Sequence, residues 1–158
     1  MSVIAEISQA LASEFDLPDA GTTTVIVVRL LTAATLGGLL GMERESKGRA
    51  AGLKTHILVA LGSALFVMAP LLAGIEPGDV TRVMQGIVSG IGFLGAGAII
   101  KLERSERIEG LTTAAGIWMV AAIGMAAGMG MEILALATTL IALGVVSMIP
   151  KFANKAAS

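Results

Sequence analysis

Residues 86–100 read GIVSGIGFLGAGAII, an apolar stretch without a charged side chain in which small residues recur at short intervals. In water, such glycine content weakens a helix by up to about 1 kcal/mol per glycine relative to alanine. In a bilayer the backbone must satisfy its own hydrogen bonds, so a helix forms there, and small side chains let neighbouring helices approach closely. The stretch therefore predicts the central packing helix of a polytopic membrane protein.

The composition extends this prediction to the whole chain. Of 158 residues, 55% are hydrophobic and 15% charged, and the mean hydropathy is +0.86. Apolar runs of about 18–20 residues match the thickness of the hydrocarbon core. We therefore expect an all-α fold with one transmembrane domain at 24–150, a periplasmic or interfacial segment at 1–23, and a cytoplasmic tail at 151–158. The first segment would form either a short interfacial helix or a loosely ordered tail.

Five spanning helices are expected, and the last is expected to stop at Pro150. Thr22 to Thr24 are candidate caps of the first helix, as are Thr112 and Thr113 of the fourth. Glycines at the spacing of close helix contacts are Gly37, Gly41, Gly86, Gly90, Gly97, Gly124 and Gly128. The expected spans are residues 24–42, 55–72, 81–100, 111–127 and 133–149.

Basic residues set the expected orientation. The 43–54 loop holds four, the 101–109 loop three and the C-terminal tail two, whereas the opposite side holds Arg82 alone. Because basic residues favour the cytoplasmic side, this bias places the N-terminus outside and the C-terminus in the cytoplasm. The 43–54 and 101–109 loops each carry a Glu-Arg pair, and each pair is followed by Gly-Leu. This similarity is consistent with a parallel repeat of two helical hairpins but does not establish it.

Several classes of protein are disfavoured. A net charge of −1 gives no basic stripe for nucleic acid, and the absence of cysteine removes disulfides and thiolate metal sites. The sequence has no phosphate-binding loop, nucleophile elbow or zinc-protease motif. We therefore expect a protein that is not an enzyme.

Carboxylates near the expected membrane surfaces are candidate ligands for a metal. Glu43 and Glu45 follow the first span, and two such carboxylates could hold a hard divalent cation such as Mg²⁺. They could instead pair with Arg44 or Arg49, in a mixed-charge loop that anchors the span. On the opposite side, Asp79 is the corresponding candidate.

Other polar residues leave two interpretations each. Asp79 and Arg82 could pair across one helical turn. Arg29 lies inside the first span, where it must pair or extend to the headgroups. His56 is either structural or a pH sensor, because its ordinary pKa is near neutral. Gln85 and Ser89 share a face, which would line a pathway or form hydrogen bonds across a helix contact.

Five short motifs resemble the MgtC/SapB family of bacterial inner-membrane proteins, in its short form without a C-terminal ACT-like domain. The motifs are GGLLGMERE at 37–45, AGLKTH at 51–56, DVTR at 79–82, GIGFLGAG at 90–97 and GLTTAA at 110–115. The residues that match the family most closely are Arg29, Glu43, Arg44, Glu45, Thr55, His56, Asp79 and Arg82.

The resemblance implies about five spans in the bacterial plasma membrane and a link to magnesium limitation, acid stress and survival of pathogens inside host cells. It leaves two functions open. One is a transporter or channel component for magnesium. The other is a regulator that binds another membrane complex, such as the proton-translocating ATP synthase. The repeated glycine pairs further predict a homodimer in the lipid bilayer.

Overall fold

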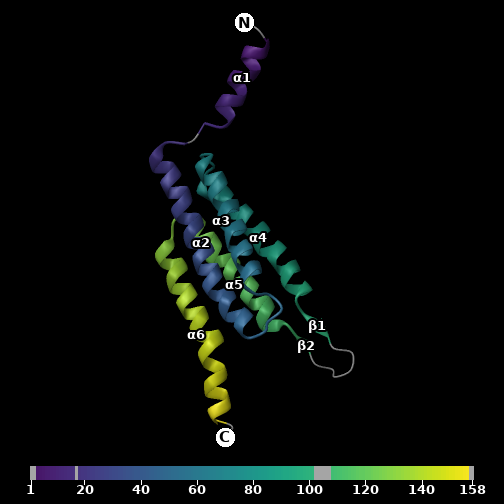
Figure 1. The fold of residues 1–158 in the computed structure, drawn as a ribbon. Helices are drawn as coiled ribbons and strands as arrows, with labels where there is room; N and C mark the ends of the chain where they lie inside the picture. Colours follow the sequence, from purple (N-terminus) through teal and green to yellow (C-terminus); the bar gives the residue numbers. More distant parts are fainter. Residues whose placement is uncertain (1–2, 17, 102–107, 157–158) are drawn as a thin grey trace.

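The computed structural model describes the backbone of residues 3–16, 18–101 and 108–156, with side chains at those positions except 100, 101, 108 and 148–156. This part of the chain is helical apart from one pair of two-residue strands (Figure 1). The elements are α1 (Val3–Glu14), α2 (Ala20–Ser46), α3 (Leu53–Leu72), α4 (Pro77–Gly97), β1 (Ile100–Lys101), β2 (Ile108–Glu109), α5 (Leu111–Gly128) and α6 (Glu132–Ala156).

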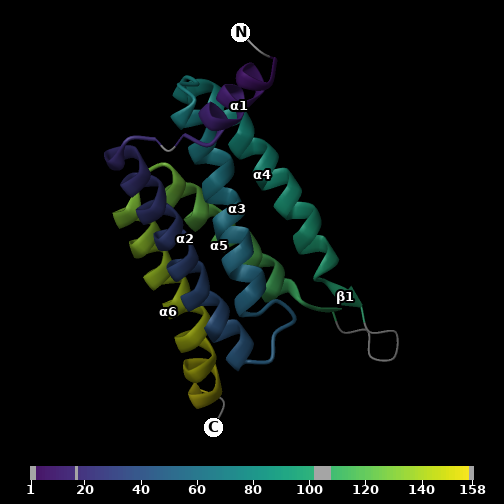
Figure 2. The ribbon, with the colours of Figure 1, turned by 45° about the horizontal axis from the view of Figure 1, so that its top comes forward.

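Helices α2 to α6 run up and down side by side, and α1 extends beyond one end of this bundle (Figures 1 and 2). One end of the bundle, which we call the hairpin end, holds the 47–52 loop, the β1–β2 pair and the C-terminal end of α6. The α3–α4 and α5–α6 turns lie at the other, which we call the turn end. For the N-terminal segment the sequence left open a short helix or a loosely ordered tail, and the structure has the helix, α1. No residue of α1 is buried.

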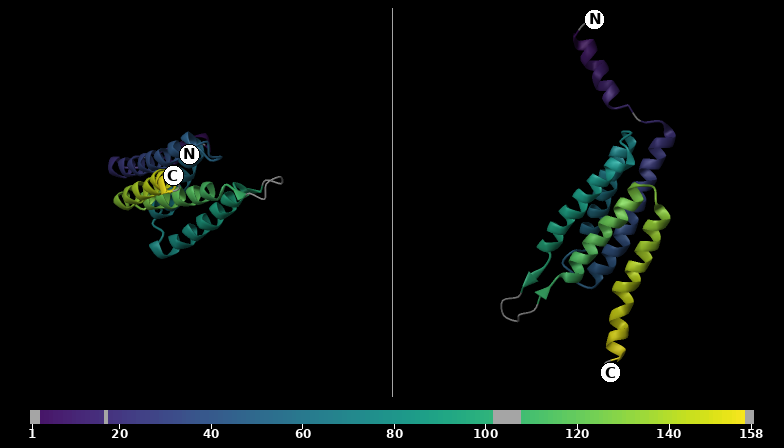
Figure 3. Two further views of the ribbon diagram at one scale, coloured as in Figure 1. Left: turned by 90° about the horizontal axis from the view of Figure 1, so that it is seen from below. Right: turned by 180° about the vertical axis from the view of Figure 1, so that it is seen from behind.

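The central helix is α5, which contacts α2, α3, α4 and α6. The expectation that residues 86–100 form the centre is wrong, because α4 lies at the edge of the bundle and makes its main contacts with α5 and α3 (Figure 3). The physical reason is the distribution of apolar residues. Helix α5 is apolar around its circumference and mostly buried, apart from exposed residues such as Leu111 and Trp118, whereas α4 has a polar side that faces away from the bundle.

Four glycines let α3 approach its neighbours closely. A Cβ atom on Gly37 would lie 2.7 Å from the Cβ of Ala60, and one on Gly41 would lie 2.8 Å from the Cα of Leu53. From α5, Cβ atoms on Gly124 and Gly128 would overlap the carbonyl oxygens of Ala60 and Ala64. Small residues therefore meet where α3 crosses α2 and α5, and the core that surrounds them is buried.

Helix ends differ from the expectations in three places. Asp19 is the N-cap of α2. Its carboxylate accepts hydrogen bonds from the main-chain N–H groups of Gly21 and Thr22, at 2.9 and 3.1 Å, and from the Thr22 hydroxyl, at 2.6 Å. These bonds, that from the Thr22 hydroxyl foremost, lower the pKa of Asp19. The threonines were expected in this role, but a carboxylate is a strong acceptor at a helix start.

The other two differences concern α5 and α6. Gly110, with φ of +92°, is the residue before α5, and no described side chain forms a capping hydrogen bond there, so Thr112 and Thr113 are not its caps. Helix α6 does not stop at Pro150 but continues to Ala156. The expected tail at 151–158 therefore begins within a helix. The β1–β2 pair, in which Ile100 faces Glu109, was not predicted because two-residue strands leave no periodic pattern.

Three helices, α2, α3 and α5, are long and apolar enough to cross a membrane, and α6 has a shorter apolar part at Glu132–Ser147. These correspond to the first, second, fourth and fifth expected spans. The described part of α4 does not reach the same hydropathy, because its outward side carries polar residues.

We predict that Gly124→Ala destabilises the bundle, because the new methyl group must displace the backbone of α3. Forcing atoms into a packed core costs about 1–3 kcal/mol. The control is Gly144→Ala on α6, where a Cβ atom meets nothing within 4 Å. Thermal unfolding in detergent should show a lowered midpoint for Gly124→Ala alone. Equal midpoints for the two variants would contradict the close approach of α5 to α3.

Candidate functional site

Three polar residues lie together at the hairpin end of the bundle, between α2, α3, α5 and α6: Glu43, Arg44 and His56, which we call the Arg44 cluster. The Arg44 side chain is 4% exposed and that of Glu43 12%, and His56 is fully buried. The Arg44 guanidinium forms an ion pair with Glu43, with 2.5 Å between Nε and Oε2. Of the two partners that the sequence left open for Glu43, a metal or an arginine, the structure supplies the arginine.

Arg44 also connects α2 to α6. Its Nη2 atom donates a hydrogen bond to the main-chain oxygen of Val146, at 3.4 Å. Val146 lies four residues before Pro150, which has no N–H group to donate to that oxygen. The carbonyl that the proline leaves free in α6 is therefore satisfied by a charged side chain of α2.

His56 is held by its own helix start. Its Nδ1 atom lies 2.9 Å from the carbonyl oxygen of Gly52, which can only accept, so Nδ1 carries the hydrogen. In the neutral ring, Nε2 is then an acceptor, and it has no partner among the described residues. A Cβ atom on Gly116 would lie 3.4 Å from Nε2 and 3.9 Å from the Arg44 Cδ, so glycine at this position leaves room for both side chains.

A cavity of about 190 Å³ adjoins the cluster, and it is lined in part by Gly116 and Val146, which contact the cluster. Besides His56 Nε2, Glu43 Oε1 is a buried acceptor without a described partner. Buried acceptors of this kind are usually satisfied by a small hydrogen-bond donor such as water. Sequence reasoning missed Gly116 and the Val146 carbonyl. The signal for the carbonyl was Pro150, and no local pattern singled out Gly116.

Glu45 does not join Glu43. Its Oε2 atom accepts a hydrogen bond of 2.7 Å from the main-chain N–H of Leu53, at the start of α3. A carboxylate at this position also interacts favourably with the helix dipole. Gly52 permits the contact, since a Cβ atom there would lie 2.5 Å from the same oxygen. Glu43 thus binds an arginine of its own helix, α2, whereas Glu45 binds the start of α3.

Arg29 lies near the turn end and has a partner that the sequence did not suggest. Its Nη1 atom donates to the carbonyl oxygen of Gly128, at 3.0 Å, and its guanidinium lies against Gly130, which has φ of +79°. Gly128 is the last residue of α5, where carbonyl groups lack helical partners and a cation is favoured. Arg29 is therefore the polar cap of the central helix.

The remaining predicted residues are dispersed. Asp79, Arg82, Gln85 and Ser89 are exposed on α4, and no ion pair joins Asp79 to Arg82 in the described structure. Arg49 is exposed in the 47–52 loop, whereas Thr55 is half-buried, Thr112 is exposed and Thr113 is buried.

Asp79 lies in the first turn of α4, at the turn end of the bundle. Glu43 and Glu45 lie in the last turn of α2, at the opposite, hairpin end (Figure 1). Within the residues whose side chains are placed, no three carboxylate or imidazole groups gather where they could hold a metal ion. The three predicted metal ligands, Glu43, Glu45 and Asp79, are thus not brought to one place in this chain.

A helical bundle with membrane-length apolar helices, in which the half-buried Arg29 and the buried Arg44 satisfy carbonyl groups and a carboxylate, defines a helical membrane protein. The chain belongs to the MgtC family, which it matches over residues 30–155. No solved structure matches the chain significantly.

Curated relatives come from several bacteria. The chain is 45% identical over 119 residues to "Putative magnesium transporter YhiD" of Escherichia coli K12, covering 69% of this chain and 53% of that protein. It is 46% identical over 117 residues to protein SrpB of Synechococcus elongatus, covering 65% and 63%. Protein MgtC of Salmonella typhimurium is 44% identical over 117 residues, covering 74% and 49%. The matched segment thus spans from about half to just under two thirds of these relatives.

We predict that Arg29→Met lowers the free energy of unfolding by about 1–3 kcal/mol, the cost of leaving a buried carbonyl without a donor. Arg49→Met is the matched control, because Arg49 is exposed and its side chain makes no described hydrogen bond or ion pair. Its effect should remain within about 0.5 kcal/mol. The measurement is denaturant unfolding in detergent micelles. A loss of the same size in both variants would refute the capping role.

We predict that Arg44→Met is more damaging, at about 3–5 kcal/mol, because Glu43 is left as an uncompensated buried charge. Adding Glu43→Gln removes that charge, so the double variant should be more stable than Arg44→Met alone. The same unfolding assay measures all three proteins. If the second substitution adds to the first instead of offsetting it, the two side chains do not form a buried pair.

Proposed function

We propose that this chain is a magnesium-linked protein of the bacterial inner membrane that regulates another membrane protein and does not itself carry ions. The link to magnesium rests on the family and on a relative whose name describes a magnesium transporter. We further propose five spans, α2 to α6, with the N-terminus outside and the hairpin end in the cytoplasm. The distribution of basic residues supports this orientation.

One observation supports the regulatory function: the arginines of α2 bind groups within the bundle itself. Arg29 satisfies the end of α5, and Arg44 binds Glu43 and the Val146 carbonyl. An ion path through hydrocarbon requires polar ligands along its length. Between the two arginines the described core is formed by apolar side chains such as Leu40, Ala60 and Val120. Transport was the first hypothesis from the sequence, and the described part of the core offers no such row of ligands.

A regulator of this kind acts by binding, so its lipid-facing helix surfaces are the functional parts. Large apolar side chains are exposed on α2, α3, α4 and α6. In a bilayer these surfaces are available to lipid or to helices of other proteins. We also propose that the chain has no enzymatic activity, since the described site presents no nucleophile beside a general base.

We predict that the protein supports growth at low magnesium without moving magnesium. Growth and cell magnesium content should be measured in a bacterium that lacks its own family member, with an empty vector as the control. Purified, folded protein in liposomes should then give no magnesium flux above that of empty liposomes, while an ionophore shows that the assay responds.

Two results would contradict the proposal, and they are distinguishable. Saturable flux that is lost in the Glu43→Gln, Asp79→Asn double variant would establish transport. Growth identical to that with the empty vector would remove the link to magnesium.

A further inference from the structure

The side of α4 that faces away from the bundle is unusual for a membrane helix. At 3.6 residues per turn, Val80, Met84 and Ile87 share the side that packs into the bundle. The opposite side, which we call the outer face, is exposed and combines charged, polar, small and aromatic residues. It consists of Asp79, Arg82, Gln85, Gly86, Ser89, Gly90 and Phe93.

The glycines of this face are open, whereas comparable glycines elsewhere are closed. The pairs Gly37/Gly41 and Gly124/Gly128 have the same four-residue spacing, and a Cβ atom on any of the four would collide with α3. On Gly86 and Gly90, a Cβ atom would meet nothing within 4 Å. Two of the three pairs are thus used for helix contacts within the chain, and the third has no helix against it.

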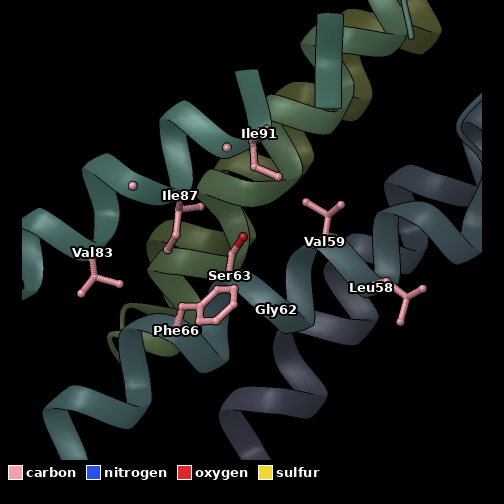
Figure 4. Close-up of a pocket in the computed structure, with 10 residues that line it drawn as sticks. Leu58, Val59, Gly62, Ser63, Phe66, Val83, Ile87 and Ile91 are labelled. Carbon is pink, nitrogen blue, oxygen red and sulfur yellow. The ribbon is translucent and has the colours of Figure 1, made fainter. Parts of the chain in front are cut away.

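A groove of about 560 Å³ adjoins the open pair, between α3 and α4 (Figure 4). Leu58 and Phe66 on its α3 side are 68% and 61% exposed. Ser63 lies at its floor, is only 3% exposed, and directs its hydroxyl oxygen toward the groove. That hydroxyl has no hydrogen-bond partner among the described residues. The Ser63 hydroxyl is therefore available to a polar group that enters the groove.

We infer that the outer face and the groove bind a second copy of this chain, so that two α4 helices cross at Gly86 and Gly90. The inference rests on the proposed topology, in which α4 spans the membrane. There, the exposed amide of Gln85 and hydroxyl of Ser89 are costly against lipid and favourable against another helix. Acyl chains could fill the groove but offer no hydrogen bond to these groups or to Ser63.

Charge complementarity favours a second copy over an unrelated helix. Copies of one protein insert with the same orientation, so a two-fold axis must run along the membrane normal and the two α4 helices are parallel. Asp79 and Arg82 have opposite charge, lie on the same face one turn apart and form no ion pair with any residue whose side chain the structure describes. In a parallel pair, Asp79 of each copy faces Arg82 of the other. Gln85 is likewise self-complementary, because its amide both donates and accepts.

The experiment is disulfide crosslinking of the full chain in native membranes, which is clean because the chain has no cysteine. Ser89→Cys should give a dimer on oxidation, since the Cα atoms of a disulfide must lie within about 7 Å. The matched control is Ile141→Cys on α6, which is 69% exposed to the same surroundings but distant from the outer face. It should show only the background of random collision.

Two further variants test which surface is responsible. Adding Gly86→Leu and Gly90→Leu to Ser89→Cys should abolish the dimer without changing the unfolding midpoint, because the side chains extend into open space. Adding Gly144→Leu, another glycine with open surroundings, should leave the dimer intact.

A charge exchange tests the identity of the partner. Asp79→Arg should reduce the dimer to background, because four cations then meet, and Asp79→Arg with Arg82→Asp should restore it. An unrelated partner helix would not follow the exchange.

Several outcomes overturn the inference. Equal crosslinking at positions 89 and 141 would mean collision alone, and a dimer that survives both leucines would place the contact elsewhere. An adduct between Ser89→Cys and a different protein would identify another partner, and no adduct would leave the face to lipid. None of these outcomes depends on the magnesium assays, so the two proposals fail separately.

Discussion

The bundle depends on how closely α5 approaches α3. Transmembrane helices gain little from the hydrophobic effect when they associate within a bilayer, so their association relies on dispersion contacts and on hydrogen bonds. Gly124 and Gly128 bring the backbone of α5 onto the carbonyl groups of Ala60 and Ala64, and this contact is tight because neither helix presents a large side chain there. Once α5 lies against α3, its remaining sides are available to α2, α4 and α6, and every other helix of the bundle is positioned by it.

The contacts of Arg29 and Arg44 follow from the same arrangement. The last carbonyl groups of α5 lack partners within the helix, and Gly128 is buried. Arg29 supplies a donor at Gly128, and Arg44 supplies one to the carbonyl that Pro150 leaves free in α6. Both arginines lie on α2, which therefore provides polar partners at each end of the bundle. Their positions within a helix are explained by satisfying main-chain groups, and no transported ion is required to explain them.

Much of this fold could be predicted from the sequence, because length and hydropathy are local properties. The helices at 24–42, 55–72 and 111–127 appear where they were expected, to within a few residues. The choice of central helix could not be made in this way. Glycine spacing marks helices that can pack closely, but it does not say which of several such helices has a partner, and α4 has the spacing without the partner inside the chain.

The candidate site, too, could be predicted in part: its residues but not their contacts. Glu43, Arg44 and His56 were singled out from their residue types and from the family motifs, and the structure places them together. Their contacts could not be read from the sequence, because the partners are main-chain groups. The carbonyl oxygens of Gly52, Gly128 and Val146 belong to residues whose side chains give no hint of a polar role.

The two arginine contacts also constrain the order in which the molecule is completed during synthesis. Arg29 and Gly128 are 99 residues apart, and Arg44 and Val146 are 102 residues apart. When α2 leaves the ribosome, neither of these carbonyl groups has yet been made. The contacts of α2 with Gly128 and Val146 can therefore form only after α5 and α6 have been synthesised, whereas the Arg44–Glu43 pair can form within α2 alone.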